Sequence, residues 1–284
     1  SSSSAASDVY KRQDFLLTEA GFGADMGAER FFNIKCRTSG LHPDAAVLVV
    51  TVRALKAHSG RYKIVAGKPL PPDMLADSPE DVLAGADNLR KHIEIVRTFG
   101  VSPIVALNVF PDDHDDEIEA VRRVAEQEGA HFAASTHVVD GGNGAMELAR
   151  AVVDACHQPT DFRYTYDLAD SLETKIEKIA TEVYGADGID ISPQAAKDLA
   201  HFEELGYGRL PVVMAKTHLS LSHDPQLKGR PTGWRLPVRE VRAAVGAGYV
   251  YAICGNMRTM PGLGAHPAAE RIDIDDNGQV VGLF

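Results

Sequence analysis

The sequence predicts an α/β fold built on a parallel sheet. Its first half alternates short runs of apolar, β-branched residues with longer amphipathic stretches that begin with acids and end at glycine. Strands that alternate with helices at such spacings are joined by crossover connections, which make neighbouring strands parallel. The composition agrees, because 44% hydrophobic and 24% charged residues are ordinary for a globular chain with a packed core.

The first strand and the first long helix are expected at residues 44–52 and 79–100. The strand segment reads DAAVLVVTV, a β-branched run bounded by polar residues, and we expect it to be buried on both faces of the sheet. The helix segment opens with a proline and two acids, carries apolar residues at helical spacing and ends at Gly100.

Two further strand and helix pairs follow. Residues 102–108 (SPIVALN) predict a second buried strand, and residues 112–129 predict a helix with an acidic first turn that closes on glycine. Residues 130–135 (AHFAAS) predict a third, short strand, and residues 144–156 a further helix. The three strands are therefore expected to lie in one parallel sheet.

We divide the chain into three parts. Residues 1–13 (SSSSAASDVYKRQ) have no hydrophobic period, so we expect a non-native leader there, with a native flexible terminus as the alternative. Residues 14–158 form the expected first domain, and 159–284 a smaller C-terminal α/β domain, with the QPTD stretch at 158–161 as the boundary. The elements expected in the second domain are helices at 171–184 and 193–206, strands at 210–216 and 248–254, and a hairpin at 271–284 around Asn277-Gly278.

Charge, hydropathy and cysteine usage exclude several classes of protein. Forty acidic against 29 basic residues give a net charge of −11, which disfavours a nucleic-acid partner. No apolar run approaches the roughly 20 residues that a membrane span needs. Cys36, Cys156 and Cys254 are too far apart for a disulfide framework or a cysteine zinc site. We expect buried thiols and a cytoplasmic protein.

The loop after strand 102–108 is the first candidate site, because parallel sheets present functional residues at the carboxyl ends of their strands. The amide of Asn108 and the carboxylate of Asp112 can address the edge of a ring, and Phe110-Pro111 offers a flat apolar surface. The alternative is an ordinary turn in which Pro111 and Asp112 start the next helix. Spacing alone leaves both interpretations open.

Two glycine-rich stretches are weaker candidates. Gly141 and Gly142 lie in DGGNG at 140–144, where backbone N–H groups can approach an anion at a helix start, although such glycines also serve purely steric ends. The G-x-G-x-x-x-G at 21–27 follows no clear strand and is a poor dinucleotide fingerprint. A nicotinamide-dependent dehydrogenase is therefore disfavoured.

No metal site is predicted, since His218 and His223 lack a third ligand at metal spacing and are more typical of a solvated loop. The sequence contains no G-x-S-x-G, no H-E-x-x-H and no G-x-x-x-x-G-K-[ST]. Residue chemistry alone therefore indicates a ligand-binding α/β protein without an assigned reaction.

Longer strings of sequence carry a family resemblance. From Asp14 to Phe284 the chain closely resembles the C-terminal half of the formate–tetrahydrofolate ligases, also called formyltetrahydrofolate synthetases. The strings that carry it are Thr18–Arg37 (TEAGFGADMGAERFFNIKCR), Thr51–Gly60, Asn88–Val101, Lys175–Ile189, Leu210–Trp234 (with VVMAKTHLSLSHDP) and the ending from Thr259 (TMPGLGAHPAAERIDIDDNG).

The resemblance implies a P-loop NTPase-like sheet that is partial here, because the N-terminal half is missing. It also implies ATP with Mg²⁺, formate and tetrahydrofolate as reactants, formyl phosphate as the intermediate, a monovalent cation, and a homo-oligomer at full length. The phosphate-binding P-loop and its lysine lie in the missing half of the family pattern, so no catalytic residue is assigned. We also expect the truncated sheet to expose apolar surface.

The resemblance assigns the candidate site to folate. Phe110 and Pro111 match the family's platform beside the pterin, and Asn108, Asp112, Gly141 and Gly142 are the remaining expected substrate-binding residues. Val138 stands where the family commonly has a stacking Trp. The expected function is ATP-dependent formation of 10-formyltetrahydrofolate, ADP and phosphate; the alternative is a catalytically inactive folate-binding fragment that lacks the P-loop.

Overall fold

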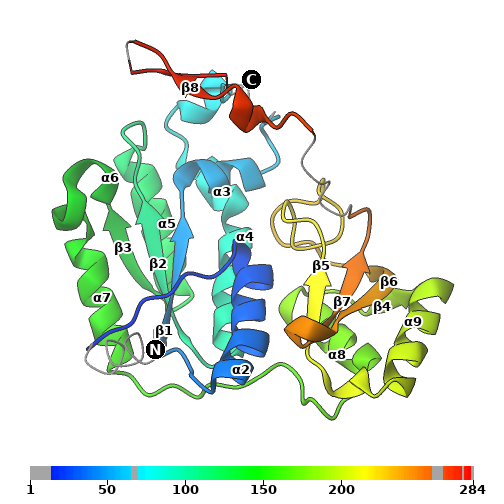
Figure 1. The fold of residues 1–284 in the computed structure, drawn as a ribbon. Helices are drawn as coiled ribbons and strands as arrows, with labels where there is room; N and C mark the ends of the chain where they lie inside the picture. The colour runs from blue at the N-terminus through cyan, green and yellow to red at the C-terminus, as the bar shows by residue number, and fades with distance from the viewer. Residues whose placement is uncertain (1–13, 65–68, 258–264, 277, 283–284) are drawn as a thin grey trace, which may run out of the picture.

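The structure is a computed structural model that describes residues 14–64, 69–257, 265–276 and 278–282. These residues form two separate sheets with helices around them and a short hairpin near the C-terminus (Figure 1). The α/β prediction is confirmed. The leader expected at residues 1–13 lies outside the described residues. In the described ranges, no helix combines the length and the hydropathy needed to cross a membrane.

The first sheet contains the three strands expected from the sequence. They are β1 (Ala45–Val50), β2 (Ser102–Asn108) and β3 (His131–Ser135), in the order β1-β2-β3. Both pairs are parallel, with Val47 opposite Ile104 and Ala106 opposite Ala133. The prediction of a parallel sheet is confirmed for this part of the chain.

Helices cover the two faces of this sheet unequally. The side chains of Val105 and Leu107 pack with Val121 and Val124 in a core that α3 (Val52–His58), α4 (Pro79–Thr98) and α5 (Asp115–Gln127) share. Alternate residues of β2, such as Ile104, point to the opposite face. There α7 (Met146–Cys156) packs mostly on β3 and less on β2 and β1.

Local capping explains where two elements depart from their expected bounds, and a 3₁₀ turn accounts for a third. Strand 44–52 ends at Val50 because Thr51 caps α3, its Oγ1 accepting the Ala54 N–H at 3.1 Å. The helix expected from residue 112 starts at Asp115, where His114 and Glu117 form a capping box. A short 3₁₀ turn, η4 (Gly141–Ala145), precedes α7.

The helical segment at residues 23–39 was not expected from the sequence. It consists of η1 (Gly23–Ala28) and η2 (Phe31–Cys36), both wound as π-helix, and α2 (Arg37–Ser39). A side chain at Gly27 would overlap the Gly21 carbonyl, so close backbone approach accounts for glycine in this stretch. Phe32 packs on Phe99, the residue that follows α4, with ring centroids 4.7 Å apart.

The second sheet has the order β4-β6-β7-β5, formed by β4 (Ile189–Ile191), β6 (Leu236–Ala244), β7 (Tyr249–Cys254) and β5 (Val212–Ala215). Its outer pairs are parallel and the central pair, β6 with β7, is antiparallel. Helices α8 (Leu172–Lys178) and α9 (Pro193–Glu204) pack on it, and η5 (Ile179–Val183) contributes side chains to the same core. Strands β4 and β6 were not expected from the sequence.

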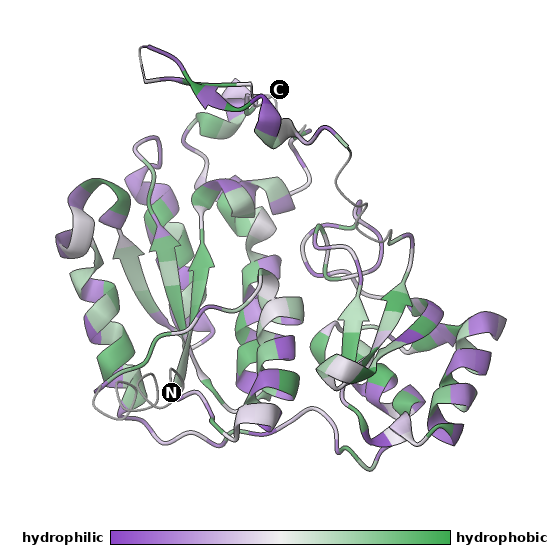
Figure 2. Cartoon of the chain, in the orientation of Figure 1, coloured by the Kyte–Doolittle hydropathy of each residue, from purple (hydrophilic) through white to green (hydrophobic). Residues whose placement is uncertain are grey.

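Helix α4 contributes to both hydrophobic cores. Val82, Leu89 and Ile93 lie in the core of the first sheet, whereas Ile95 and Val96 belong to the core that contains the second sheet. The strands of both sheets are apolar bands in Figure 2. The two sheets are therefore packed onto one long helix, while the division at residue 158 stays a prediction.

The remaining expectations have mixed outcomes. The hairpin forms as β8 (Asp273–Ile274) and β9 (Val280–Val281), with Gly278 at φ 75°, while Asn277 lies outside the described residues. Cys36 and Cys254 are buried as expected. Cys156 is only half-buried, so that prediction was wrong for this thiol.

The expectation that the first strand is buried on both faces was wrong. Val47 is 40% exposed and Val49 is 72% exposed, although β1 is as apolar as β2. Among the described strands only β2 pairs with β1, so β1 lies at an edge of the sheet, and α7 packs mostly over β3 at the opposite edge.

Candidate active-site edge

The carboxyl ends of β1, β2 and β3 lie at one edge of the first sheet, at the top in Figure 1. The Val109 N–H donates to the Ser135 carbonyl at 3.0 Å, which ties the end of β2 to the end of β3. Helix α3 follows β1 on one side, and α6 (His137–Asp140) follows β3 on the other (Figure 1). The loop after β2 therefore lies between two flanking segments.

Phe110 has a cation against its ring. The guanidinium carbon of Arg53, in the first turn of α3, lies 4.1 Å from the ring centroid. Its Nη2 is 3.5 Å from Oδ2 of Asp112, so one cation contacts both the ring and the carboxylate. The Phe110 N–H donates to Oδ2 of Asp113 at 2.9 Å, which fixes the backbone of the loop. Burial raises the pKa of Asp113, and the Phe110 N–H and Arg53 oppose that rise.

Asn108 ends β2 with an unused acceptor. Its side-chain Oδ1 is buried and has no hydrogen-bond partner among the described residues. A buried amide oxygen without a donor costs free energy, which a ligand or water donor would recover. The position expected to address a ring edge therefore has a free acceptor.

Pro111 and Asp112 do not start helix α5. Both are exposed, and the helix is capped by His114, so the alternative in which they simply begin the helix was wrong. Glu117 and Lys56 form a buried ion pair beneath the loop. Asn108, Phe110, Pro111 and Asp112 thus belong to a separate, braced turn between β2 and α5, and their role in substrate binding stays a prediction.

Val138 lies on α6, the flanking segment after β3, and is 72% exposed. The start of this segment is fixed by Thr136, whose Oγ1 donates to Asp140 at 2.6 Å, and by His137, whose Nδ1 lies 2.8 Å from the Ser135 Oγ. A valine at this exposed position presents an aliphatic surface where an aromatic side chain would present a ring.

Glycine occurs at three positions of the next turn for different structural reasons. Gly141 has φ 59° and ψ −142°, a conformation that only glycine adopts readily. Gly142 has open space where a side chain would lie, so the backbone leaves room for an approaching group. At Gly144 an added Cβ would lie 2.6 Å from the Thr136 carbonyl carbon, so close packing requires this third glycine. The steric interpretation therefore holds at residue 144, while anion binding at Gly141 and Gly142 stays a prediction.

The described residues do not fit a magnesium or triphosphate site of their own. They contain no group of three or more His, Cys, Asp and Glu side chains that could hold a metal ion. The turn from β1 to α3 reads Val50-Thr51-Val52 and contains no glycine to cradle phosphates. We therefore derive no step through a metal at this edge.

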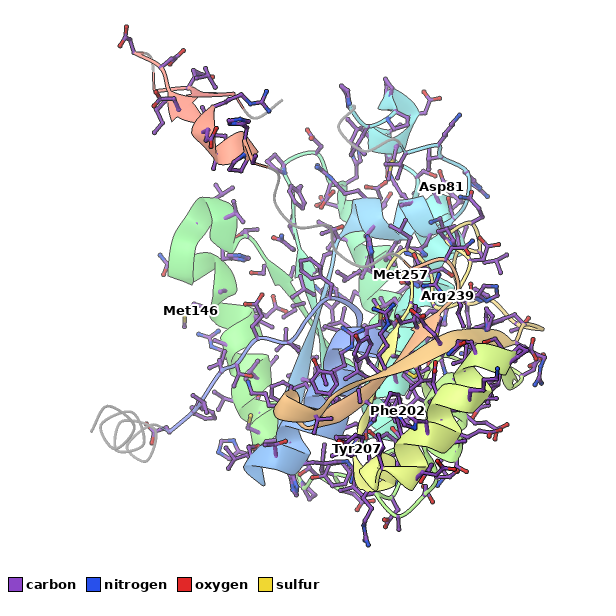
Figure 3. All side chains as sticks on the ribbon, turned by 45° about the vertical axis from the view of Figure 1, so that its right-hand side comes forward. Asp81, Met146, Phe202, Tyr207, Arg239 and Met257 are labelled. Atoms are coloured by element: carbon purple, nitrogen blue, oxygen red, sulfur yellow. The ribbon has the colours of Figure 1, made fainter. Side chains whose placement is uncertain are left out.

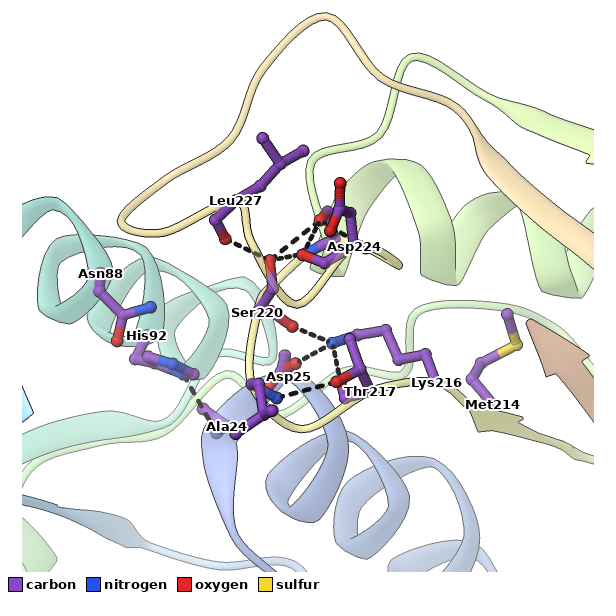
Figure 4. A network of polar contacts seen from close by, with 12 residues as sticks. Ala24, Asp25, Asn88, His92, Met214, Lys216, Thr217, Ser220, Asp224 and Leu227 are labelled. Atoms are coloured by element: carbon purple, nitrogen blue, oxygen red, sulfur yellow. Dashed lines mark hydrogen bonds and ion pairs between the residues drawn. The ribbon is translucent and has the colours of Figure 1, made fainter. Parts of the chain in front are cut away.

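A second polar cluster lies between η1 and the loop after β5 (Figure 4). The ammonium group of Lys216 is buried and lies 2.7 Å from a carboxylate oxygen of Asp25. It also donates to the carbonyls of Thr217 at 3.1 Å and Ser220 at 2.7 Å. Three acceptors use its three protons, so this lysine ties the two segments together and has no donor left for a ligand.

The loop at residues 217–230 is also attached to the helices of the first sheet. The Gly229 N–H donates to Nδ1 of His58 at 3.2 Å, and Asn88 of α4 donates to the Gly229 carbonyl at 3.3 Å. Arg230 pairs with Glu94 at 2.6 Å. Burial lowers the pKa of His58 to about 4, which keeps its ring neutral and able to accept this hydrogen bond.

His218 and His223 belong to no group of three or more potential metal ligands in the described ranges. His218 is exposed, whereas the half-buried ring of His223 lies 5.8 Å from that of Trp234. Ser220 and Ser222 are the buried polar side chains of the segment, and their hydroxyl oxygens are 2.9 Å apart. The loop is thus shaped by its serines and by Lys216.

Arg53 was missed by the sequence analysis. The one signal for it was its position directly after the strand predicted at residues 44–52, and nothing in a single sequence shows that its guanidinium reaches Phe110.

Comparison with known proteins gives one family. A family model described as "Formate--tetrahydrofolate ligase" matches residues 1–284. A curated formate–tetrahydrofolate ligase of Cutibacterium acnes is 80% identical over 271 residues, which is 95% of this chain and 48% of the relative. One from Saccharopolyspora erythraea is 69% identical over 270 residues, with the same coverage, and one from Roseiflexus castenholzii is 55% identical over 271. The chain spans about half the length of the curated relatives it matches.

Proposed function

Because the chain belongs to the formate–tetrahydrofolate ligase family, we propose that it is part of an ATP-dependent ligase of one-carbon metabolism. The reaction joins formate to tetrahydrofolate and gives 10-formyltetrahydrofolate, ADP and phosphate, with formyl phosphate as the intermediate. The sequence string at residues 210–234 and the match over the whole chain support this assignment.

The part of the reaction that we assign to this chain is the binding of the folate ring. One observation carries the proposal: Phe110, backed by Arg53, lies two residues after Asn108, whose buried Oδ1 has no donor in the part of the chain that the structure describes. We expect a flat ring stacked on Phe110, on the face opposite Arg53, to bring its N–H groups towards that acceptor. Stacking fixes the plane of the ring, and the hydrogen bond fixes its rotation.

Orientation is then the chemical contribution of this edge. The N10 amine of tetrahydrofolate must meet the carbonyl carbon of formyl phosphate at attack distance, and holding one reactant still supplies much of the rate. Phe110 and Asn108 would hold the ring, while the rest of the tetrahydrofolate molecule would be directed along the edge of the sheet. Phosphoryl transfer needs basic groups and Mg²⁺ around the γ-phosphate, and we assign these, with the monovalent cation, to the part of the ligase outside this chain.

The second candidate is a folate-binding segment that catalyses nothing alone. The absence of a Walker A sequence from the 284 residues favours it for the isolated chain. It predicts no formate-dependent release of ADP from this chain, whereas a full-length ligase that contains it should turn over. Turnover by the isolated chain would contradict the assignment of phosphoryl transfer to the other part.

Titration with tetrahydrofolate tests the platform directly. We expect Phe110→Ala to weaken binding by roughly tenfold, since stacking on an aromatic ring is worth about 1–3 kcal/mol at comparable nucleic-acid sites. Phe202→Ala is the matched control, because Phe202 is a half-buried phenylalanine that lies with Tyr207 against the second sheet (Figure 3). Equal dissociation constants for Phe110→Ala and the unmodified chain would overturn the folate assignment.

A further inference from the structure

The outer edge of β1 is unprotected in a way that stable sheets avoid. Within the described chain, β2 is the one strand that pairs with β1, so the six residues Ala45–Val50 present a second, unpaired backbone edge. The segment AAVLVV carries no charge, proline or bulge, which are the devices that natural edge strands use against pairing. Such an edge is a template for another strand.

The face of β1 is exposed as well as its edge. Val47 and Val49 lie opposite Ile104 and Ala106 of β2, which are 0% and 3% exposed. On the same face the two valines are 40% and 72% exposed, because α7 packs mostly over β3 and covers β1 only in part. Purely parallel sheets occur almost only with helices on both faces, so a covering helix is missing here together with the strand.

A second apolar run is exposed in the described chain. Phe15, Leu16 and Leu17 precede the helical segment that leads into β1, and they are 41%, 56% and 77% exposed. Three consecutive large apolar side chains in water indicate surface that is buried in the complete protein. Figure 2 shows β1 as a continuous apolar strand, like β2 beside it.

We propose that the edge and open face of β1 are the docking surface for the remainder of the ligase, which adds a parallel strand to β1 and a helix over Val47 and Val49. The relatives supply the occupant, since about half of their length lies outside the match to this chain. A second copy of this chain is disfavoured, because each copy carries a net charge of −11 and the two would repel each other.

The docking has a consequence for the site. A strand parallel to β1 ends at the same edge as Thr51, so the loop that follows it arrives beside Arg53 and Phe110. The docked part would thereby deliver its residues to the folate edge proposed above. This consequence rests on the proposed function, whereas the docking surface itself rests on the exposed strand and on the length of the relatives.

Association of two separate parts tests the surface without using activity. The 284-residue chain is co-expressed with the tagged part of the Cutibacterium acnes ligase that lies outside the match, and the stoichiometry and the dissociation constant of the isolated complex are measured. We expect a one-to-one complex in which Val49→Lys weakens association tenfold or more. The matched control is Val245→Lys, at a valine 49% exposed beside the second sheet.

Because Val49 is mostly exposed, the lysine should leave the isolated chain folded, which the fluorescence of Trp234 verifies. Hydrogen exchange provides a second readout, since the amides of β1 that are not bonded to β2 should become protected in the complex. Unchanged exchange in β1, or equal affinity of the Val49→Lys and Val245→Lys chains, would overturn the docking surface. So would self-association of the chain alone that Val49→Lys abolishes, because the occupant would then be a second copy.

A complex that forms as expected but shows no formate-dependent turnover would count against the proposed function and leave the docking surface standing. In a full-length ligase that contains this segment, Val49→Lys should also lower the melting temperature more than Val245→Lys does. An equal effect of the two substitutions there would contradict the burial of Val49.

Discussion

Arg53 contacts both the ring of Phe110 and the carboxylate of Asp112, so it determines how the loop after β2 is presented. Its guanidinium covers one face of the ring, so a ligand stacked on Phe110 as proposed would lie on the opposite face. The interaction is partly screened, because the Arg53 side chain is 27% exposed. A cation above a ring in such a setting is worth about 0.5–1 kcal/mol, rising towards 2 when it is desolvated.

We expect Arg53→Gln to weaken tetrahydrofolate binding about three- to tenfold, with Arg53→Lys closer to the unmodified chain. In a full-length ligase the KM for tetrahydrofolate should rise while kcat changes little, since Arg53 acts through the position of Phe110. Arg122→Gln is the matched control, because Arg122 lies 4.5 Å from the Phe132 ring centroid, on α5. Equal changes in KM for both substitutions would contradict this positioning role.

Glu29 is a buried carboxyl that is left without full hydrogen bonding. Burial raises its pKa to about 7, and the hydrogen bond from Asn33, at 2.8 Å, only partly opposes this rise. Its second oxygen, Oε2, has no partner among the described residues. The folded protein therefore binds this proton more tightly than the unfolded chain does.

The sign of the pH effect follows from that difference. The contribution of protonated Glu29 to stability is fully present below pH 4.5 and is lost as the pH rises through about 7. Glu29→Gln removes this loss. The difference in free energy of unfolding between the Glu29→Gln variant and the unmodified chain should therefore grow in favour of the variant as the pH rises between these values, by up to about 3 kcal/mol. Urea denaturation between pH 5 and 8 measures this difference, and Glu126→Gln, at an exposed glutamate, is the control. A difference independent of pH would contradict the assignment.

At the residue level the sequence identified part of the candidate site. Asn108, Phe110 and Asp112 were found because they follow a strongly apolar strand, and in the structure they do form the turn at its carboxyl end. Arg53 was not found, because it is 57 residues from Phe110 in the sequence and the two side chains meet only in the folded chain. Side-chain contacts between loops depend on sheet register, which a pattern of hydrophobicity does not encode.

Among the elements, α3 and α5 are joined by a buried ion pair. Lys56 and Glu117 are 1% exposed, and Lys56 also donates to the carbonyls of Met74 at 3.0 Å and Ala76 at 2.7 Å. Glu117 accepts the Ser78 N–H at 2.9 Å. The pair therefore holds the connection before α4 against both helices, beneath the loop that carries Phe110.

Breaking this pair should be costly, because the remaining charge stays buried without compensation. We expect Glu117→Gln to destabilise the chain by about 3–5 kcal/mol. Glu119→Gln is the control on the same helix, since its pair with Arg122 is exposed and worth little. Midpoints of urea denaturation for the two variants measure the difference, and similar midpoints would contradict a buried, uncompensated lysine.

Elements with a clear period were predicted and elements without one were not. The apolar β2 and the amphipathic α4 matched their expected ranges within two residues. Strand β6 was missed because LPVREVRAA mixes charges with apolar residues around a bulge near Arg239. The helical segment 23–39 was missed because its glycines and small residues resemble a loop, and its helical form depends on packing against α4.

For the whole molecule, the packing of α4 predicts that the two sheets unfold together. Phe99 follows α4, is 1% exposed and packs on Phe32 in the core that contains the second sheet. Val82 and Leu89 of the same helix belong to the core of the first sheet. One element that is essential to two cores couples their unfolding, whatever division into domains the sequence suggests at residue 158.

We therefore expect a single transition in urea, with the same midpoint for Trp234 fluorescence, which reports on the second sheet, and for hydrogen exchange of β2. Phe99→Ala should lower the free energy of unfolding by about 3–5 kcal/mol with either probe, because a buried aromatic ring is lost next to the shared helix. Phe202→Ala, at a half-buried ring on α9, is the control and should cost less. If Phe99→Ala moves the Trp234 transition and leaves β2 exchange unchanged, the sheets unfold separately and α4 does not couple them.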